Sequence, residues 1–214
     1  MKDALSSSTV WVRRLREPSV VLGTILAAAW LAPLVSGWSM VLQSVLGIGA
    51  VLLICRSWLR DRVAPAELGF RVDNLLTSSI LLVVTVLPLA AVHLLVGKET
   101  FRWNRVPTYF VWALLQQFIV VAGAWRHFPR PTTSRKGLEA AALAAAFFAL
   151  AHAPNTILME LCFAGELVWL MCFARFRNLF AVALAHSLAA VAVQQDLVPG
   201  CLSSLKVGLH YWWR

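Results

Sequence analysis

Long apolar runs separated by short polar segments dominate the chain. A helix needs about 20 apolar residues to cross the hydrocarbon layer of a bilayer, and seven runs approach that length. We expect transmembrane helices at 19–36, 38–55, 75–96, 107–125, 138–152, 156–173 and 179–193. The segment 56–74 is charged and contains Pro65, which is typical of a loop or an interfacial piece. The pattern predicts an all-α, polytopic membrane helix bundle of about seven transmembrane helices, forming a single membrane domain over residues 1–214.

Composition strengthens this prediction. Hydrophobic residues make up 60% of the chain, charged residues only 14%, and the mean hydropathy is +0.74. A soluble globular protein has roughly 45–50% apolar and about 25% charged residues. These values exclude a soluble enzyme, a disordered chain and a disulfide scaffold, and they favour an integral membrane protein. No sheet is expected, because backbone groups in lipid must be hydrogen bonded within helices.

The chain carries a net charge of +9, and its basic residues are unevenly distributed. If the N-terminus lies inside, fourteen of the nineteen Lys and Arg residues fall on the inner side of the predicted spans and five on the outer side. Basic inner loops are the ordinary signature of membrane topology. We therefore expect a cytoplasmic N-terminus, contact with the lipid bilayer and no nucleic-acid partner. We expect the four cysteines to act as small buried hydrophobic residues, because they lack C-x-x-C spacing. They are Cys55, Cys162, Cys172 and Cys201.

Ionisable and amide side chains inside a membrane are costly and often mark function. Seven such residues in the predicted spans stand out: His93, Gln116, Gln117, His152, Glu160, Glu166 and His186. The two glutamates are six residues apart, about 240° around a helix, so they do not share a face. Paired amides in lipid also serve as hydrogen bonds between helices, and a single intramembrane histidine is often a packed residue. His93 has no identifiable partner, which favours such a packing role.

Two segments near the C-terminal half carry a family resemblance. Residues 147–155 resemble the F-x-x-x-H motif of the CAAX-protease and bacteriocin-processing (CPBP) family of intramembrane glutamic endopeptidases, with Phe148 and His152 in its defined places. Residues 178–187 look like that family's next motif, where a helix after a short basic turn carries His186. The turn 67–71 resembles an L-G-hydrophobic turn that often precedes the family core. The resemblance covers roughly 106–193.

The chain departs from the family pattern at three places. The family's first motif is a glutamate pair followed four residues later by arginine, whereas this chain has Gln116, Gln117 and Val121. Four residues after His186, where the family usually has Asn, stands Ala190. In the family the glutamate is thought to activate water, while His and Asn side chains position it and bind the oxyanion. A glutamine amide cannot take the proton of water, although it can orient water or donate to an oxyanion.

The resemblance therefore implies a site whose base is unassigned. The remaining candidates are His152, His186, Glu160 and Glu166, with Gln116 and Gln117 as hydrogen-bonding groups and Phe148 as a packing residue. No cofactor is implied. No metal is expected either, since two histidines without a placed third ligand fall short of a zinc site.

Two functions follow from the resemblance. The first is a divergent intramembrane endopeptidase that hydrolyses membrane-embedded, lipidated or C-terminally anchored substrates in a bacterial inner or plasma membrane. The second is a catalytically inactive member that acts as a binding, immunity or escort module in the membrane. A small transporter with His93, Glu160 and Glu166 as a proton path is a weaker alternative, because the chain has no internal repeat.

Overall fold

The computed structural model describes residues 2–35, 37–96, 100–127, 135–197, 202 and 204–212, with side chains described from Leu15 onward except at 81, 96, 135 and 136. Cys201, Lys98 and Arg130 lie outside the described residues. In the described part all regular structure is helical, which confirms the all-α prediction. The α-helices are α1 Lys2–Trp30, α2 Ser39–Asp61, α3 Leu75–Val84, α4 Leu87–Val96, α5 Val106–Gly123, α6 Arg135–Leu150, α7 Thr156–Phe176 and α8 Leu179–Ala192.

Short helical turns join or extend these helices. The 3-10 turns are η1 Ala32–Leu34, η2 Pro65–Leu68, η3 Trp103–Arg105, η4 Trp125–His127 and η6 Gly208–Tyr211, and α8 continues into a π-helical turn, η5 Val193–Leu197.

The described part has five helical segments long and apolar enough to cross a membrane, or six if one bent helix pair is a single span. This finding supports an integral membrane protein, but the predicted number of seven spans is wrong. The five are Leu15–Leu34, Ser39–Asp61, Trp103–His127, Thr156–Phe176 and Leu179–Leu197. The cytoplasmic N-terminus stays a prediction.

Two of the seven predicted spans account for the difference. The run 138–152 forms α6, whose 16 residues rise only about 24 Å at 1.5 Å per residue, short of a bilayer's hydrocarbon thickness. The run 75–96 forms α3 and α4, which meet at a bend of 49°. Pro88 lies in the first turn of α4, where proline is tolerated, and it has no N–H with which to continue the backbone hydrogen bonds of α3.

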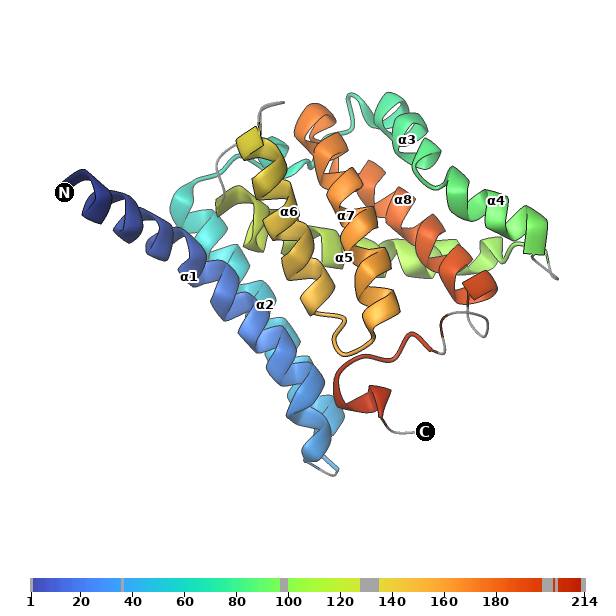
Figure 1. Ribbon diagram of the computed structural model, residues 1–214, viewed down its shortest axis with the longest axis horizontal. Helices are drawn as coiled ribbons and strands as arrows, with labels where there is room; N and C mark the ends of the chain where they lie inside the picture. Colours follow the sequence, from blue (N-terminus) through green and yellow to red (C-terminus); the bar gives the residue numbers. More distant parts are fainter. Residues whose placement is uncertain are drawn as a thin grey trace.

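The helices pack around α8, which lies against α5 and α3 and also contacts α4 and α7 (Figure 1). Helices α6 and α7 form an antiparallel pair, and α5 crosses behind them (Figure 1). Small side chains let α8 approach its neighbours closely, and most of that helix is buried. The α1–α2 hairpin is attached to one side of this core (Figure 1).

The start of α8 is held by the turn that the sequence resemblance singled out. Gly69 has φ +84°, a left-handed conformation that favours glycine, and its carbonyl accepts a 2.8 Å hydrogen bond from the backbone N–H of Leu179. Asn178 caps α8 by accepting from the N–H of Ala181 at 2.9 Å, and its amide donates to Asn74 Oδ1 at 2.8 Å. The loop before α3 therefore fixes where α8 begins.

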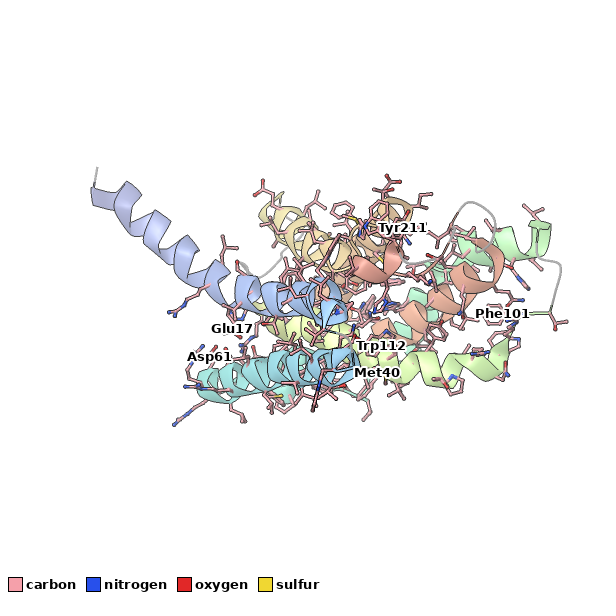
Figure 2. The ribbon with its side chains drawn as sticks, turned by 90° about the horizontal axis from the view of Figure 1, so that it is seen from below. Glu17, Met40, Asp61, Phe101, Trp112 and Tyr211 are labelled. Atoms are coloured by element: carbon pink, nitrogen blue, oxygen red, sulfur yellow. The ribbon has the colours of Figure 1, made fainter. Side chains whose placement is uncertain are left out.

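An ionic cluster attaches the α1–α2 hairpin to the end of α5. Arg126 of η4 lies 2.8 Å from Glu17 Oε1 and 3.4 Å from Asp61 Oδ2. Ser57 donates a hydrogen bond to Glu17. Figure 2 shows Glu17 on α1 and Asp61 on α2 near each other at this end of the hairpin. At the other end of the hairpin, η6 packs against α1, so the hairpin is held at two points along its length.

Candidate functional site

A cavity of about 440 Å³ lies between α4, α5, α6, α7 and α8. Its wall is mostly apolar, with side chains such as Leu89, Trp112, Leu161 and Trp169. Leu205, from the segment after α8, also lines it. A few polar side chains interrupt the apolar wall, and they are Thr85, Tyr109, Gln116, His152 and His186, together with the thiol of Cys162. A mostly apolar cavity with a few polar groups is the usual form of a ligand or active site.

His152 follows the last turn of α6 and lines this cavity. Its Nδ1 lies 2.8 Å from the backbone carbonyl of Phe148, one helical turn earlier. A carbonyl oxygen only accepts hydrogen bonds, so Nδ1 carries the proton. In the neutral imidazole Nε2 then holds the lone pair, and it is not hydrogen bonded to any described residue. His152 therefore supplies an acceptor at the cavity.

His186 lies in the middle of α8 and lines the same cavity. Its Nδ1 lies 3.1 Å from the side-chain Nε2 of Gln117 on α5. An amide NH₂ group only donates, so Nδ1 accepts and the ring proton resides on Nε2. The ring is stacked on Trp169 with centroids 5.1 Å apart. The histidines thus have opposite hydrogen-bonding character.

Phe148 lies between the two imidazoles, as an edge-to-face contact with each. Its ring centroid is 4.8 Å from that of His152 and 5.6 Å from that of His186. The Phe148 side chain is buried. Because such edge-to-face contacts have a preferred geometry, Phe148 restricts how the two rings turn relative to the cavity.

The two consecutive glutamines have different surroundings, because neighbouring residues of a helix point about 100° apart. Gln116 is half-buried and lines the cavity. Gln117 is fully buried and donates to Glu166 Oε2 on α7 at 2.7 Å. Glu166 is also fully buried. Gln117 Oε1 and Glu166 Oε1 have no hydrogen-bond partner among the described residues.

Of the seven polar residues singled out in the sequence, the structure brings five side chains together and leaves out Glu160 and His93. Gln116, His152 and His186 line the cavity, while Gln117 and Glu166 lie directly behind His186. Glu160 is exposed on α7 and is not part of the cavity wall. The helical phase difference between the two glutamates separates them, as the sequence predicted.

The expectation that His93 has no partner is wrong. Its Nδ1 lies 2.9 Å from Asp196 Oδ1 in η5, and both side chains are largely buried. Asp196 lies beyond the predicted end of the last span at residue 193, so no local pattern connected the two residues. In the same turn Gln194 accepts a 2.8 Å hydrogen bond from the hydroxyl of Tyr109. These contacts join α4, α5 and the end of α8.

The contact between Trp169 and Thr85 was also missed from the sequence. Trp169 Nε1 on α7 donates a hydrogen bond of 3.0 Å to Oγ1 of Thr85, which lies at the break between α3 and α4. Only the fold places these residues side by side, since they are far apart in the chain. This hydrogen bond connects the indole ring that stacks on His186 to the bend between α3 and α4.

Within the part of the chain that the structure describes, no group of three or more His, Cys, Asp or Glu side chains is placed to hold a metal ion. The described site offers an imidazole acceptor, an imidazole donor and a carboxamide on one cavity wall. This set is suited to proton transfer and to hydrogen bonding of a polar group in an apolar environment.

Comparison with known proteins gives one match. Residues 110–192, less than half of the chain, match the family model described as Type II CAAX prenyl endopeptidase Rce1-like. The match confirms the resemblance to the CAAX-protease family over this segment, which contains α5 from residue 110 to the end of α8 and hence both histidines. No curated protein and no solved structure matches the chain significantly.

Proposed function

We propose that the protein is an intramembrane endopeptidase of the CAAX-protease type, in which His152 is the general base and His186 the oxyanion donor. The observation that carries the proposal is the opposite hydrogen-bonding character of the two imidazoles on one cavity. Hydrolysis of a peptide bond needs both a proton acceptor for water and a donor for the developing oxyanion. The match to the Rce1-like family over 110–192 supports the same reaction class.

In this proposal the proton follows a closed path. His152 Nε2 takes a proton from a water molecule as the water oxygen bonds to the scissile carbonyl carbon. The carbonyl oxygen becomes an oxyanion that accepts from His186 Nε2–H. When the intermediate collapses, the C–N bond breaks and the leaving nitrogen takes the proton from His152. A carboxylic acid and an amine are released, and both histidines return to their starting forms.

Gln116 has a supporting part in this reaction. It lines the cavity at the place where the family resemblance expects a glutamate, and its amide orients the water or the substrate without accepting a proton. The family's glutamate base is absent, and general-base catalysis typically contributes about 10²–10⁴-fold. Ala190 also lines the cavity where an Asn is usual. We therefore expect slower turnover than in a member with both groups.

The apolar wall of the cavity favours a substrate with an apolar segment. The family description names a prenyl endopeptidase, so a prenylated or otherwise membrane-anchored peptide is the proposed substrate class. An apolar chain would lie against side chains such as Leu89, Trp112 and Leu161. The bilayer is the second partner, because three helical segments beside the cavity are long and apolar enough to span it: Trp103–His127, Thr156–Phe176 and Leu179–Leu197.

The second candidate is an inactive member that binds a membrane peptide without cutting it. The observation that favours it is the presence of Gln116 and Ala190 on the cavity wall, where the resemblance expects Glu and Asn. In that case the cavity keeps its shape and apolar lining while the chemistry is lost. The two candidates differ in whether His152 matters for product formation.

The test uses the full chain in lipid nanodiscs with a farnesylated peptide ending in a CAAX sequence. Wild type, His152→Ala and His186→Ala are compared by mass spectrometry of the products, and peptide binding is measured in parallel. His210→Ala is the matched control, because His210 is exposed and is not part of the cavity wall. The proposal expects cleavage that falls by at least about 10²-fold in each cavity variant.

A second variant separates the two candidate functions. Gln116→Glu restores a carboxylate at the cavity and should raise the cleavage rate of an active enzyme by about 10²-fold or more. Peptide binding that survives in all variants, with no cleavage by wild type or by Gln116→Glu, would establish the binding module instead. Full cleavage by His152→Ala would overturn the assignment of the base.

A further inference from the structure

We infer that Glu166 is a positioning residue that acts through Gln117 to hold His186 with its Nε2–H toward the cavity. This inference deepens the proposed function and rests on it, since the role of Glu166 is to prepare the oxyanion donor. Glu166 itself does not line the cavity. It reaches the site through one intervening side chain.

The contacts form an ordered chain across three helices. Glu166 on α7 accepts from Gln117 Nε2 at 2.7 Å, and the same nitrogen lies 3.1 Å from His186 Nδ1. A primary amide nitrogen has two hydrogens in fixed directions, so it serves both acceptors at once. In its ionised form the carboxyl group only accepts hydrogen bonds, so Oε2 can pair with the NH₂ group of Gln117 but not with its carbonyl oxygen. Glu166 thus selects the amide orientation that donates to His186.

The opposite orientation of the Gln117 amide would exchange the donor and acceptor nitrogens of the His186 ring. If Gln117 turned its carbonyl oxygen toward His186, Nδ1 would have to carry the ring proton. The lone pair would then lie on Nε2, facing the cavity, where it repels an oxyanion instead of binding it. The pairing with Glu166 prevents this, because a carboxylate oxygen and an amide oxygen facing each other have no hydrogen between them.

One turn after Gln117, helix α5 has no polar side chain that could pair with the Gln117 amide. Val121, four residues after Gln117, is buried and apolar. The partner therefore comes from α7, and both side chains of the pair are fully buried. Buried polar groups that lose a partner are costly, so this geometry is strongly preferred over one in which Gln117 is unpaired.

A second contact from α7 acts on the same ring. Trp169 is three residues after Glu166, hence on a similar face of the helix, and its indole is stacked on His186 at 5.1 Å with 26° between the planes. The indole is fixed in turn by its hydrogen bond to Thr85. Helix α7 therefore sets the plane of the imidazole through Trp169 and its tautomer through Glu166 and Gln117.

The first test is spectroscopic. Histidine ring nitrogens are ¹⁵N-labelled in the full chain in nanodiscs, and the His186 signals are assigned by their loss in His186→Ala. We expect wild type to show Nε2 protonated and Nδ1 unprotonated, and Glu166→Leu to show a mixture of tautomers. Glu166→Gln should also show both tautomers, because its amide can accept from the NH₂ group of Gln117 or donate to the Gln117 carbonyl oxygen. Glu160→Leu, an exposed glutamate on the same helix, is the control and should match wild type.

The second test is kinetic, with the farnesylated CAAX peptide as substrate. Glu166→Leu should lower kcat by up to about 10²-fold with little change in KM, since loss of an oxyanion donor costs roughly 10²–10³-fold. Glu166→Gln should lower kcat less than Glu166→Leu, because its amide still pairs with Gln117 in the orientation that donates to His186 for part of the time. A wild type without cleavage overturns the proposed function and this role with it. An active wild type whose His186 tautomer and kcat are unchanged in Glu166→Leu overturns the role of Glu166 alone.

Discussion

Replacing Gly69 by alanine should destabilise the fold through the placement of α8. Gly69 has φ +84°, and a Cβ built there would lie 2.6 Å from Phe173 Cε2 and 2.7 Å from the backbone nitrogen of Leu179. Both distances are far below normal van der Waals contact, and one of the contacts is with backbone. The turn must therefore move away from the start of α8.

The expected cost has two parts. A left-handed conformation costs a non-glycine residue roughly 1–2 kcal/mol, and overpacking in a well-packed region typically costs about 1–3 kcal/mol. We expect Gly69→Ala to lower the free energy of unfolding by about 2–5 kcal/mol. The displaced turn would also weaken the hydrogen bond from Leu179 to the Gly69 carbonyl, which is 2.8 Å long. Since His186 is on α8, the proposed cleavage activity should fall as well.

The assay is reversible unfolding in mixed lipid and detergent micelles, followed by circular dichroism and by tryptophan fluorescence. Gly47→Ala is the matched control, because Gly47 lies in α2 with nothing within 4 Å of an added Cβ. Alanine is the better helix former by about 1 kcal/mol, so the control should be neutral or slightly stabilising. If Gly69→Ala stays within about 0.5 kcal/mol of wild type, the argument from the turn is refuted.

Two further predictions concern contacts outside the cavity. Asn178→Ala removes the cap of α8 and a buried amide, so the free energy of unfolding should fall by about 1–3 kcal/mol; an effect no larger than that of exposed Asn104→Ala would contradict this. Asp196→Asn weakens the pairing with His93 that holds the end of α4. Amide hydrogen exchange in α4 should then become about tenfold to a hundredfold faster, and unchanged protection would show that other contacts hold this helix.

Several candidate site residues can be recognised from the sequence because their signals are local. The segment around His152 has a short motif, and the segment around His186 follows a basic turn, so both histidines were identified before any fold was known. Gln116 and Gln117 were noticed because amides in the middle of an apolar run are costly. These observations need only neighbouring residues, and the structure places all four around one cavity or directly behind it.

The choice between Glu160 and Glu166 needed the tertiary structure. Both lie in the same apolar run, and their separation along the helix shows only that they face different directions. Packing of α7 against α6, α8 and α3 decides which direction is the interior. The same holds for Asp196, whose partner His93 is 103 residues away, because long-range pairs leave no mark in a local pattern.

The sequence by itself determined the class of the protein: an apolar, helical membrane chain with costly polar groups in its second half. Hydropathy and helical period are properties of adjacent residues, so they can be read along the chain. The burial of Glu166, the pairing of His93 with Asp196, and the hydrogen bonds from Glu166 through Gln117 to His186 were decided only by tertiary packing. Those features depend on how whole helices meet, where the burial of each side chain is settled by its neighbours in space.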